Sequence, residues 1–374
     1  MALINFKRYL LLFFIYIFFF LIGDVILSNF FYDKNLSYAC YKYSKEFYNL
    51  KSNCSSYERW EIRKNKPFKV DTDKNGYRHL GKERFKNERE TIAFLGDSQT
   101  YGLGLEYRDT FVGKVEKKYD NYNVLNLAVP SYSPTVYNYT LKQLLKRKVY
   151  PSKIVLVLDI GDVYQEFNRW SLFPGEQKPK LITKIDKKKE DENIKGWKKI
   201  RRENFKITRI IIYNLKKYLK SIKIFFTSEK DKFHRSNKVE QTHFAEFTYK
   251  DKNDLNKNFW DNESLQVGLR KVSLNLSDIS KLSKKINSEF YILIFPWPET
   301  LEYGQNYFNW EKFVEDNCIK IKCTKVINLY SIFRHLKNNT KDFREKYFLN
   351  DDNHINEKSN KILYNEIIKE IFED

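Results

Sequence analysis

From residue 91 to the C-terminus, the chain alternates between short apolar segments and longer amphipathic ones, which restricts the folds that it can adopt. The continuous β-branched and leucine run at 153–158 is typical of a strand buried on both faces. The spacing predicts strands at 91–95, 123–127, 153–158, 290–295 and 326–329, and helices at 110–119, 135–148, 265–286 and 358–372. We expect Asp109 to cap the first helix. Such alternation predicts an α/β fold in which helices flank a parallel sheet.

The alternation stops near residue 170, and residues 174–262 are rich in lysine and carry no strand signal. They contain one amphipathic helix, whose apolar stripe consists of Ile207, Ile211, Leu215, Leu219 and Ile222. Such a stripe usually packs against a protein core, although a basic helix of this kind is also able to lie on a membrane surface. We therefore predict one α/β domain over residues 91–374, interrupted by a helical insertion at 174–262.

The N-terminal 90 residues divide into an apolar segment and a polar one. An uncharged run over residues 9–23 follows two basic residues, Asp24 interrupts it, and a second apolar stretch extends from Val25 to Tyr32. Together the two stretches exceed the roughly 20 residues that a helix needs to cross a bilayer. No Ala-x-Ala-like cleavage site follows, which favours an uncleaved signal anchor over residues 1–32 rather than a buried helix. Residues 33–90 are broken by turn signals and predict an extended lead-in.

The orientation of the predicted anchor follows from its short N-terminal tail. Such a tail stays in the cytoplasm most simply, which predicts a single-pass membrane protein whose bulk lies outside the cytoplasm, in the periplasm. Lys34, Lys42 and Lys45 follow the span, so the basic residues do not clearly favour the N-terminal side and the orientation stays open.

The four cysteines form two local pairs, Cys40 with Cys54 and Cys318 with Cys323. An even count in an exported domain permits disulfides, and free buried thiols are the alternative. A metal site needs closer ligand spacing or histidine partners, and the sequence offers neither. We therefore predict no metal and no cofactor.

The formal net charge of +20 has two interpretations. An anionic partner such as nucleic acid or an acidic membrane surface is one of them. The lysines are scattered along the whole chain, however, and no nucleic-acid-binding motif accompanies them. We favour a general compositional bias and predict no nucleic-acid partner. A protein that binds membrane surfaces by charge alone remains a weaker alternative.

A candidate nucleophile, Ser98, directly follows the first predicted strand in the segment Phe94-Leu-Gly-Asp-Ser-Gln-Thr-Tyr-Gly102. This position lies at the carboxyl edge of a parallel sheet, where open α/β sheets bind ligands. A serine hydroxyl needs a base to become a strong nucleophile. Among five histidines, His354 alone has carboxylates two and three residues before it, Asp352 and Asp351. Either is close enough to accept its Nδ1–H and fix its tautomer.

These segments resemble two blocks of the SGNH/GDSL hydrolase family. The segment around Ser98 resembles the first block, and Asp351–His354 resembles the closing Asp-x-x-His block, in the same order along the chain. The resemblance covers roughly residues 70–374 and includes the lead-in Asp73-Lys-Asn-Gly-Tyr-Arg78. It implies a three-layer, flavodoxin-like fold with a parallel sheet.

The resemblance also implies roles for individual residues. Ser98 would be the nucleophile and His354 the general base. Asp351 fits the Asp-x-x-His spacing, and Asp352 fits the Asp-x-His spacing of some relatives; we lean slightly to Asp351. The backbone N–H of Ser98 would contribute to the oxyanion hole, which stabilises the charge that develops in the transition state.

The middle blocks of the family are altered in this chain. Asn126-Leu-Ala-Val-Pro-Ser131 has Ala128 and Ser131 where glycines are common, and the Ser131 N–H is still able to donate. Asp159-Ile-Gly-Asp162 has Gly161 where the family usually carries an asparagine that donates to the oxyanion. Loss of such a donor typically costs about 10²–10³ in rate. Either another group replaces it, such as Asn126 or a backbone amide, with the Gly161 position itself as a candidate, or the enzyme is slow.

Two further residues are predicted substrate contacts. Asp97 directly precedes the serine, and Trp297 lies in Phe295-Pro-Trp-Pro-Glu299 after a predicted strand, at the same edge of the sheet. An aromatic ring between two prolines forms a rigid wall for a sugar or acyl group. The alternative for Trp297 is a structural turn with its ring in the core.

The sequence therefore predicts a membrane-anchored serine ester hydrolase or O-acyltransferase acting on an acylated cell-envelope glycan or lipid. Hydrolysis and transfer use the same residues, so the sequence does not choose between them. The alternative is a catalytically weak or silent protein of the same fold that binds glycan or scaffolds an envelope complex. The altered third block favours that alternative, and the intact Ser, His and Asp set argues against it.

Overall fold

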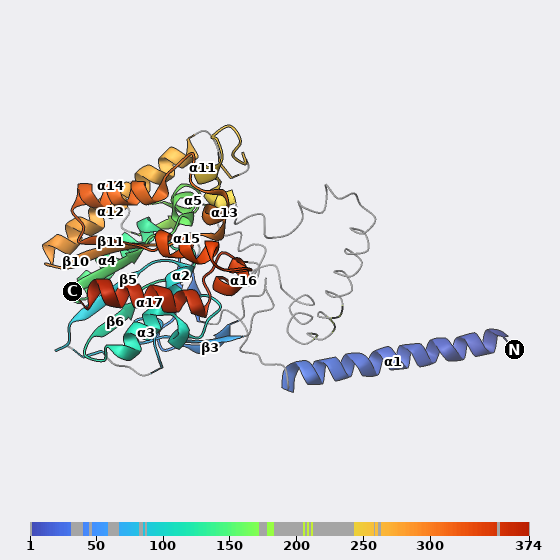
Figure 1. Cartoon of the computed structure of the whole chain (residues 1–374). Coiled ribbons are helices and arrows are strands. Elements are labelled where there is room, and N and C mark those ends of the chain that lie inside the picture. The colour runs from blue at the N-terminus through green and yellow to red at the C-terminus, as the bar shows by residue number, and fades with distance from the viewer. Residues whose placement is uncertain are drawn as a thin grey trace. The chain divides into compact units, whose positions relative to one another are not determined.

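The computed structural model describes residues 2–30, 40–44, 47–58, 67–81, 85–86, 88–171, 178–182, 205, 208, 211, 243–257, 259–260, 263–349 and 352–373 (Figure 1). The chain forms two compact units. The first unit comprises Met1–Leu36 and Asp186–Asn237, and the second comprises Ser37–Ile185 and Lys238–Asp374.

The first unit contains one long apolar helix, α1 (Ala2–Phe30). Its stretch Arg8–Leu27 has a mean hydropathy of 2.8 and is long and apolar enough to cross a membrane. Apolar side chains are exposed all around this stretch, so it has no single buried face. A helix long and apolar enough to span a membrane is confirmed, while the span itself and its orientation stay predictions.

Within the same unit, the carboxylate of Asp24 accepts a hydrogen bond of 2.8 Å from the backbone N–H of Thr208. Asp24 itself is buried, which explains how one acidic side chain is tolerated in the apolar stretch. Thr208 belongs to the predicted amphipathic helix, most of whose apolar stripe lies outside the described residues. The packing of that stripe therefore stays a prediction.

The second unit is built on a five-stranded parallel sheet with the strand order β11-β10-β7-β5-β6. Its strands are β5 (Thr91–Leu95), β6 (Asn123–Asn126), β7 (Lys153–Val157), β10 (Glu289–Ile294) and β11 (Lys325–Asn328). Ile92 and Phe94 pack into the core on one face, and Ala93 and Leu95 pack into the core on the other. The predicted strands and the α/β fold are confirmed.

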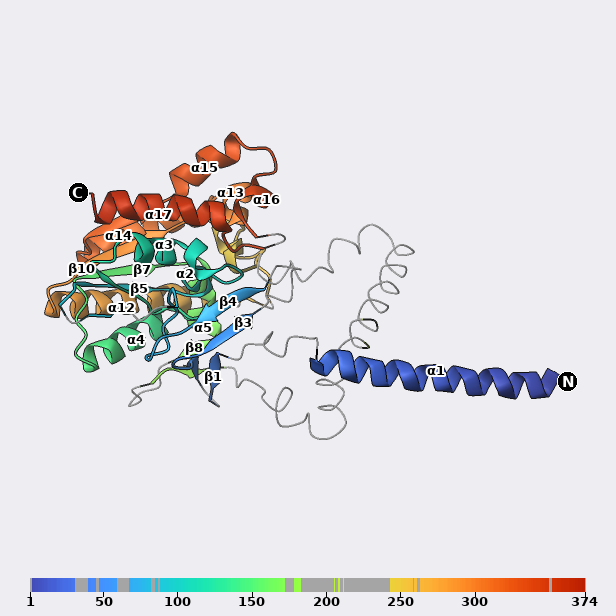
Figure 2. The same ribbon diagram turned by 90° about the horizontal axis from the view of Figure 1, so that it is seen from below.

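Helices cover both faces of the sheet. One face carries α3 (Phe111–Lys118), α15 (Tyr330–Asn338) and α17 (Glu357–Ile371), and the other carries α4 (Pro134–Lys146), α5 (Gly161–Asn168), α12 (Ser264–Lys285) and α14 (Trp310–Ile321). Figure 2 shows α3 and α17 on one side of the strands and α4 and α12 on the other. The predicted helices are confirmed to within two residues, and the fold has three layers.

The predicted cap of α3 is wrong. Thr110 is the N-cap, and its hydroxyl accepts a hydrogen bond of 3.0 Å from the N–H of Gly113. Asp109 instead ends the 3₁₀ turn η2 (Tyr107–Asp109). The extended backbone of Thr110 places its side chain over the first turn of the helix, and Asp109 lies one residue too early.

The described part of the predicted extended lead-in, residues 33–90, belongs to the second unit and contains strands. It forms two antiparallel pairs, β1 (Tyr41–Tyr43) with β2 (Tyr48–Leu50) and β3 (Ser55–Glu58) with β4 (Phe68–Asp71). Aromatic and apolar side chains from these strands belong to the same core as the sheet. The polar composition of residues 33–90 concealed these strands because only alternate side chains in them are buried.

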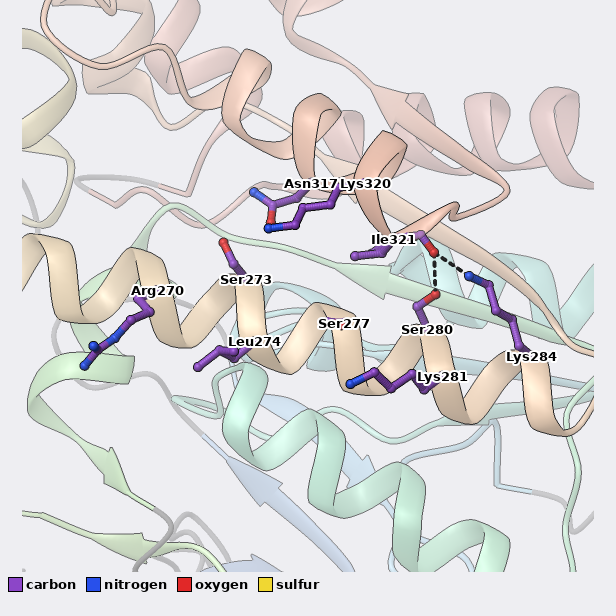
Figure 3. A pocket seen from close by; sticks show the side chains of 10 residues that line it. All are labelled: Arg270, Ser273, Leu274, Ser277, Ser280, Lys281, Lys284, Asn317, Lys320 and Ile321. Atoms are coloured by element: carbon purple, nitrogen blue, oxygen red, sulfur yellow. Dashed lines mark hydrogen bonds between the residues drawn. The ribbon is translucent and has the colours of Figure 1, made fainter.

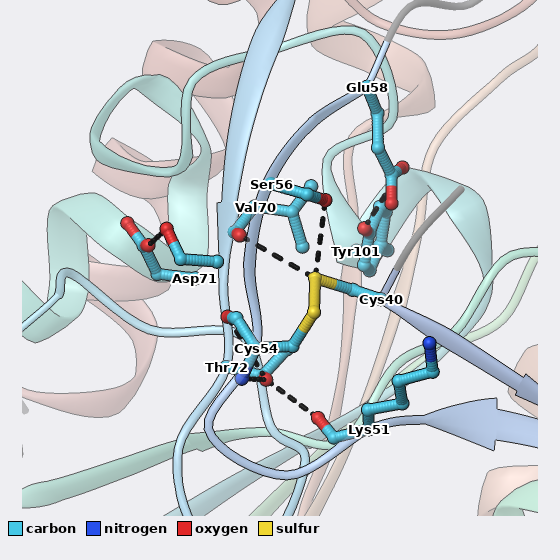
Figure 4. Close-up of a disulfide and its surroundings, with 10 residues drawn as sticks. Cys40, Lys51, Cys54, Ser56, Glu58, Val70, Asp71, Thr72 and Tyr101 are labelled. Carbon is cyan, nitrogen blue, oxygen red and sulfur yellow. Dashed lines mark hydrogen bonds between the residues drawn. A yellow bond between two sulfur atoms is a disulfide. The ribbon is translucent and has the colours of Figure 1, made fainter. Parts of the chain in front are cut away.

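Both cysteine pairs form disulfides, so the alternative of free thiols is excluded. Cys40–Cys54 joins the start of β1 to the turn before β3, with Cα atoms 5.5 Å apart (Figure 4). Cys318–Cys323 closes the end of α14, with Cα atoms 5.0 Å apart. Disulfides persist in oxidising compartments, which accords with a domain outside the cytoplasm.

The segment predicted as a helical insertion, 174–262, belongs in part to the second unit. β9 (Lys180–Leu181) pairs with β8 (Trp170–Ser171), so the expected absence of strands there is wrong. A two-residue strand is too short to carry an alternation signal. The 3₁₀ turn η3 (His243–Ala245) and α11 (Glu246–Tyr249) also contribute to the core.

Candidate active site

The turn between β5 and α2 (Ser98–Tyr101) holds Ser98 at the carboxyl edge of the sheet. Asp97 caps α2, because its Oδ1 accepts a hydrogen bond of 2.9 Å from the N–H of Gln99. Gly96 is required in this turn, since a Cβ there would lie 2.1 Å from Oγ1 of Thr100. The close approach of α2 to the end of β5 therefore fixes where the Ser98 side chain lies.

Ser98 and His354 are hydrogen-bonded although 256 positions separate them in the sequence. The distance from Ser98 Oγ to His354 Nε2 is 2.8 Å. On the other side of the ring, His354 Nδ1 lies 2.8 Å from Oδ1 of Asp352. His354 is 6% exposed and Asp352 2% exposed, so both are shielded from water. Asp352 holds the tautomer in which Nδ1 donates and Nε2 accepts the serine proton.

Of the two aspartates that could pair with His354, the structure describes only Asp352. Asp352 contacts the imidazole and also accepts a 2.8 Å hydrogen bond from the N–H of Asn353. Asp351 lies outside the described residues. The geometry favours Asp352 as the partner of His354.

Opposing effects act on the pKa of His354. Burial lowers it, but the charge and hydrogen bond of Asp352 raise it, as do the charges of Asp97 and Asp159. The result is a pKa above the ordinary value of histidine. The surroundings therefore stabilise the imidazolium that forms when the ring takes a proton from Ser98.

A residue that sequence analysis did not single out, Gln99, ties the two halves of this site together. Its Nε2 donates a 3.1 Å hydrogen bond to the carbonyl of Asn353, and its Oε1 accepts one of 3.1 Å from the N–H of Ile355. The side chain is 2% exposed. Gln99 thus binds the backbone on both sides of His354. Nothing in the local sequence pattern signals this contact.

A second unpredicted residue, Arg78, supports the loop that follows α2. Its Nη1 donates to the carbonyls of Tyr101 and Gly102, at 2.7 and 2.9 Å. Its Nη2 donates to the carbonyl of Leu105 at 2.7 Å. The hydroxyl of Tyr101 donates to Oε2 of Glu58 at 3.4 Å (Figure 4). This buried cluster anchors the folded lead-in to the serine loop.

Asp97, a predicted substrate contact, is buried and has both carboxylate oxygens engaged. Oδ1 caps α2, and Oδ2 lies 3.1 Å from Oγ of Ser98. Burial raises the pKa of Asp97, and its hydrogen bonds and the charge of His354 oppose that rise. The structure gives Asp97 a role as helix cap, and a direct contact with substrate stays a prediction.

The predicted donors to the oxyanion have different environments. Ser98 is the first residue of α2, where a backbone N–H has no intrahelical partner. Ser131 has a left-handed backbone with φ 62°, and its carbonyl accepts a 2.7 Å hydrogen bond from Trp170 Nε1. Asn126 donates to the carbonyl of Thr100 at 3.0 Å and accepts from the N–H of Ala128 at 3.1 Å. Asn126 therefore joins β6 to α2, and its predicted role as a donor stays a prediction.

The space beside Gly161 is filled by two side chains, Asp159 and Trp297. A Cβ on Gly161 would lie 2.9 Å from Oδ1 of Asp159 and 3.0 Å from two ring carbons of Trp297. Gly161 N–H donates to Asp159 Oδ1 at 2.6 Å, and Trp297 Nε1 donates to Asp159 Oδ2 at 2.7 Å. Trp297 is 4% exposed, which agrees with a ring packed in the core rather than an open wall for substrate.

Three buried carboxyl groups lie at the carboxyl ends of β5 and β7, namely Asp97, Asp159 and Asp162. Burial, followed by the charge of Asp97, raises the pKa of Asp159 to about 8. Burial also raises the pKa of Asp162 well above its ordinary value. Asp162 accepts a hydrogen bond of 2.9 Å from the hydroxyl of Tyr137. Among the described residues, no group of three or more His, Cys, Asp or Glu side chains is placed to hold a metal ion.

One cavity of about 410 Å³ lies between α12 and α14, separate from this site (Figure 3). It is lined by Arg270, Ser273, Leu274, Ser277, Ser280, Lys281, Lys284, Asn317, Lys320 and Ile321. Four of these side chains are cationic and none is acidic. Lys284 Nζ and Ser280 Oγ both donate to the carbonyl of Ile321, so two of the polar groups close the groove at one end.

Comparison with known proteins gives structural similarity alone. No family model and no curated protein matches the sequence. The structure is similar to that of TesA, with 10% identity and a TM-score of 0.38 over 75% of this chain and 97% of that one. It is also similar to the esterase EstA from Pseudoalteromonas sp., with 12% identity and a TM-score of 0.37 over 76% and 97%. A catalytic mutant of Axe2, an acetylxylan esterase from Geobacillus stearothermophilus, has 11% identity and a TM-score of 0.39 over 78% and 97%. Similarity at this level carries no argument about activity.

Proposed function

We propose that this chain is a serine ester hydrolase or O-acyltransferase of the SGNH/GDSL type. The observation that carries the proposal is the continuous set of contacts Asp352–His354–Ser98, with 2.8 Å between each neighbouring pair of atoms. A nucleophile, a base within reach and a third group that orients the base are the parts that acyl transfer through a serine requires.

The reaction follows from these contacts. Ser98 Oγ attacks the acyl carbon while its proton moves to Nε2 of His354, and the resulting imidazolium is stabilised by Asp352. Collapse of the tetrahedral intermediate transfers that proton to the leaving alcohol and leaves an acyl-serine. Water or a sugar hydroxyl then attacks the acyl-serine and gives its proton to His354. Collapse of the second tetrahedral intermediate breaks the bond between the acyl carbon and Ser98 Oγ, releases the acid or the new ester, and returns the proton from His354 to Ser98.

The substrate class is proposed to be an acylated glycan or lipid of the cell envelope. Two features support it: the apolar helix α1, which is able to anchor the chain in a membrane, and the two disulfides, which accord with an oxidising compartment. An anchored domain meets polymers and lipids close to the membrane surface. The proposal includes both hydrolysis and transfer, because both reactions proceed through the same acyl-serine.

A silent binding or scaffold protein is the second candidate. The observation that favours it is Gly161, which has no side chain to donate to an oxyanion. The aligned Asp352–His354–Ser98 contacts favour the enzyme, since a scaffold has no need of a buried imidazole next to a serine.

A fluorophosphonate probe separates the two candidates, because it reacts covalently with activated serines. We expect labelling of the detergent-solubilised wild type and none of Ser98→Ala. Ser273→Ala, on α12 and remote from Ser98, is the matched control and should label like wild type. Equal labelling of wild type and Ser98→Ala, or no labelling of either, would exclude Ser98 as nucleophile. Release of acetate from p-nitrophenyl acetate, with and without added oligosaccharide, then distinguishes hydrolysis from transfer.

A further inference from the structure

We propose that Asp159, acting as a neutral carboxylic acid, donates the hydrogen bond to the developing oxyanion that Gly161 is unable to provide. This inference rests on the proposed function and identifies one further group of the same site. Its basis is the position of Asp159, the way its carboxyl is held, and the charges that surround it.

The position follows from the parallel register of the two central strands. Leu95 of β5 pairs with Leu156 of β7, and Ser98 and Asp159 each lie three residues beyond this pair. Neighbouring strands are about 4.8 Å apart, so the ends of β5 and β7 lie side by side, and Ser98 and Asp159 follow these ends at the carboxyl edge of the sheet. The charge of Asp159 also acts on the pKa of His354, the residue that contacts Ser98. Asp159 therefore belongs to the immediate surroundings of the reacting atoms.

The carboxyl group is held by two N–H donors, one on each oxygen. Gly161 N–H donates to Oδ1 and Trp297 Nε1–H donates to Oδ2. A side chain at position 161 would collide with both Asp159 and the Trp297 ring. This arrangement therefore requires glycine at position 161. The carboxyl group of Asp159 takes the place that an asparagine side chain at position 161 would usually occupy. A fixed donor of this kind costs no reorganisation during the reaction.

The protonation state of Asp159 decides whether its carboxyl group stabilises or repels the oxyanion. A carboxylate accepts hydrogen bonds and would repel an oxyanion, whereas a carboxylic acid has one O–H to donate. The charged and titratable groups that face Asp159 come from five elements: Asp97 before α2, His354 before α17, Asp162 on α5, Tyr137 on α4 and Tyr330 on α15. Burial and the charge of Asp97 raise the pKa of Asp159 to about 8, against the effect of its two N–H donors and His354. The neutral acid is therefore the main form at pH 7.

This arrangement has a characteristic pH signature. The proposed activity rises as His354 loses its proton, and then falls as Asp159 loses its proton at a pKa of about 8. An ordinary serine esterase with an amide donor lacks the second, falling limb. In Asp159→Asn the amide is neutral at every pH and still able to donate, so activity should stay within about tenfold of wild type. In Asp159→Ala the donor is lost, and kcat/KM should fall by about 10²–10³.

The test measures kcat/KM for p-nitrophenyl acetate between about pH 5 and 10, using the full chain in detergent. We expect the falling limb in wild type and in the control Asp162→Asn, which changes a neighbouring buried acid, and its disappearance in Asp159→Asn. A falling limb that is absent from wild type, or that persists in Asp159→Asn, overturns the proposal. So does an Asp159→Asn protein that melts like wild type but is as inactive as Asp159→Ala, because that result assigns the ionised carboxylate the useful role.

Fluorophosphonate labelling of the same samples separates this proposal from the proposed function. If wild type is labelled at Ser98 and Asp159→Asn behaves like Asp159→Ala, only the role of Asp159 is wrong. If wild type is neither labelled nor active, the proposed function fails and the role of Asp159 fails with it. The wild-type pH profile decides the matter even when Asp159→Ala does not fold.

Discussion

Replacing Gln99 with leucine removes the two hydrogen bonds that join α2 to the loop carrying His354. Leucine is one bond shorter, is apolar, and neither donates nor accepts hydrogen bonds. The carbonyl of Asn353 and the N–H of Ile355 then lose their partners in the protein interior, since both residues are 5% exposed or less. The loop that positions the imidazole next to Ser98 loses its main polar attachment to the serine turn.

The expected magnitudes follow from this geometry. A buried backbone group left without a partner costs about 1–3 kcal/mol, so two of them cost about 2–6 kcal/mol. Burial of the leucine side chain returns about 1.5–3 kcal/mol, so the midpoints of the two ranges leave a net destabilisation of about 2 kcal/mol. If the imidazole shifts by about 1 Å, the rate falls by about 10²-fold, because the proton transfer depends on alignment. We expect this loss in kcat rather than in KM, since Gln99 is buried away from solvent.

The assay compares wild type, Gln99→Leu and Gln99→Glu by urea denaturation and by steady-state hydrolysis of p-nitrophenyl acetate. Glutamate still accepts from Ile355 N–H but adds negative charge near His354, so the rising limb of its pH profile should move to higher pH. Gln143→Leu on α4 is the matched control, because the side chain of Gln143 makes no hydrogen bond among the described residues. A Gln99→Leu protein with wild-type stability and kcat within about threefold of wild type would refute the reasoning.

Three further results are expected. Burial raises the pKa of Glu58 from 4.5 to about 7, so the folded state favours the protonated form of this side chain. The stability that Glu58 contributes is complete below pH 4.5 and is lost as pH rises through 7, by about 3 kcal/mol in total, and urea denaturation at pH 5 and pH 8 should show a smaller decline in Glu58→Gln than in wild type. Replacing Cys40 and Cys54 with serine should lower the free energy of unfolding by about 3 kcal/mol, the cost of releasing a loop of this length, and an unchanged urea midpoint would contradict this. The full chain should stay with membranes after an alkaline carbonate wash, and a chain without residues 1–32 should be released; equal retention of both would show that α1 is not the anchor.

The strands and helices of the second unit were accessible from the sequence because their signals are local. A run such as Lys153–Val157 is apolar on both faces, and this pattern is typical of a central strand in a parallel sheet. Ser98 and His354 were also accessible, since one follows such a strand and the other has nearby carboxylates. The strands of the lead-in and β9 were missed, because short or half-buried strands leave no regular pattern in the sequence.

The partners within the site depended on tertiary structure. The spacing permits either aspartate and slightly favours Asp351, whereas the fold brings Asp352 to 2.8 Å from the imidazole. Gln99 looks like an ordinary polar residue until the loop before α17 packs against α2.

The candidate nucleophile Ser98 is thus a local feature, whereas its surroundings are not. A few neighbouring residues determine the turn after the buried strand, with its glycine before Ser98. The filling of the space beside Gly161 by Asp159 and Trp297 requires β7 and β10 to lie side by side in the sheet. The chain alone determined that a serine and a histidine were available, and only packing between distant segments decided which groups surround them and in which protonation state.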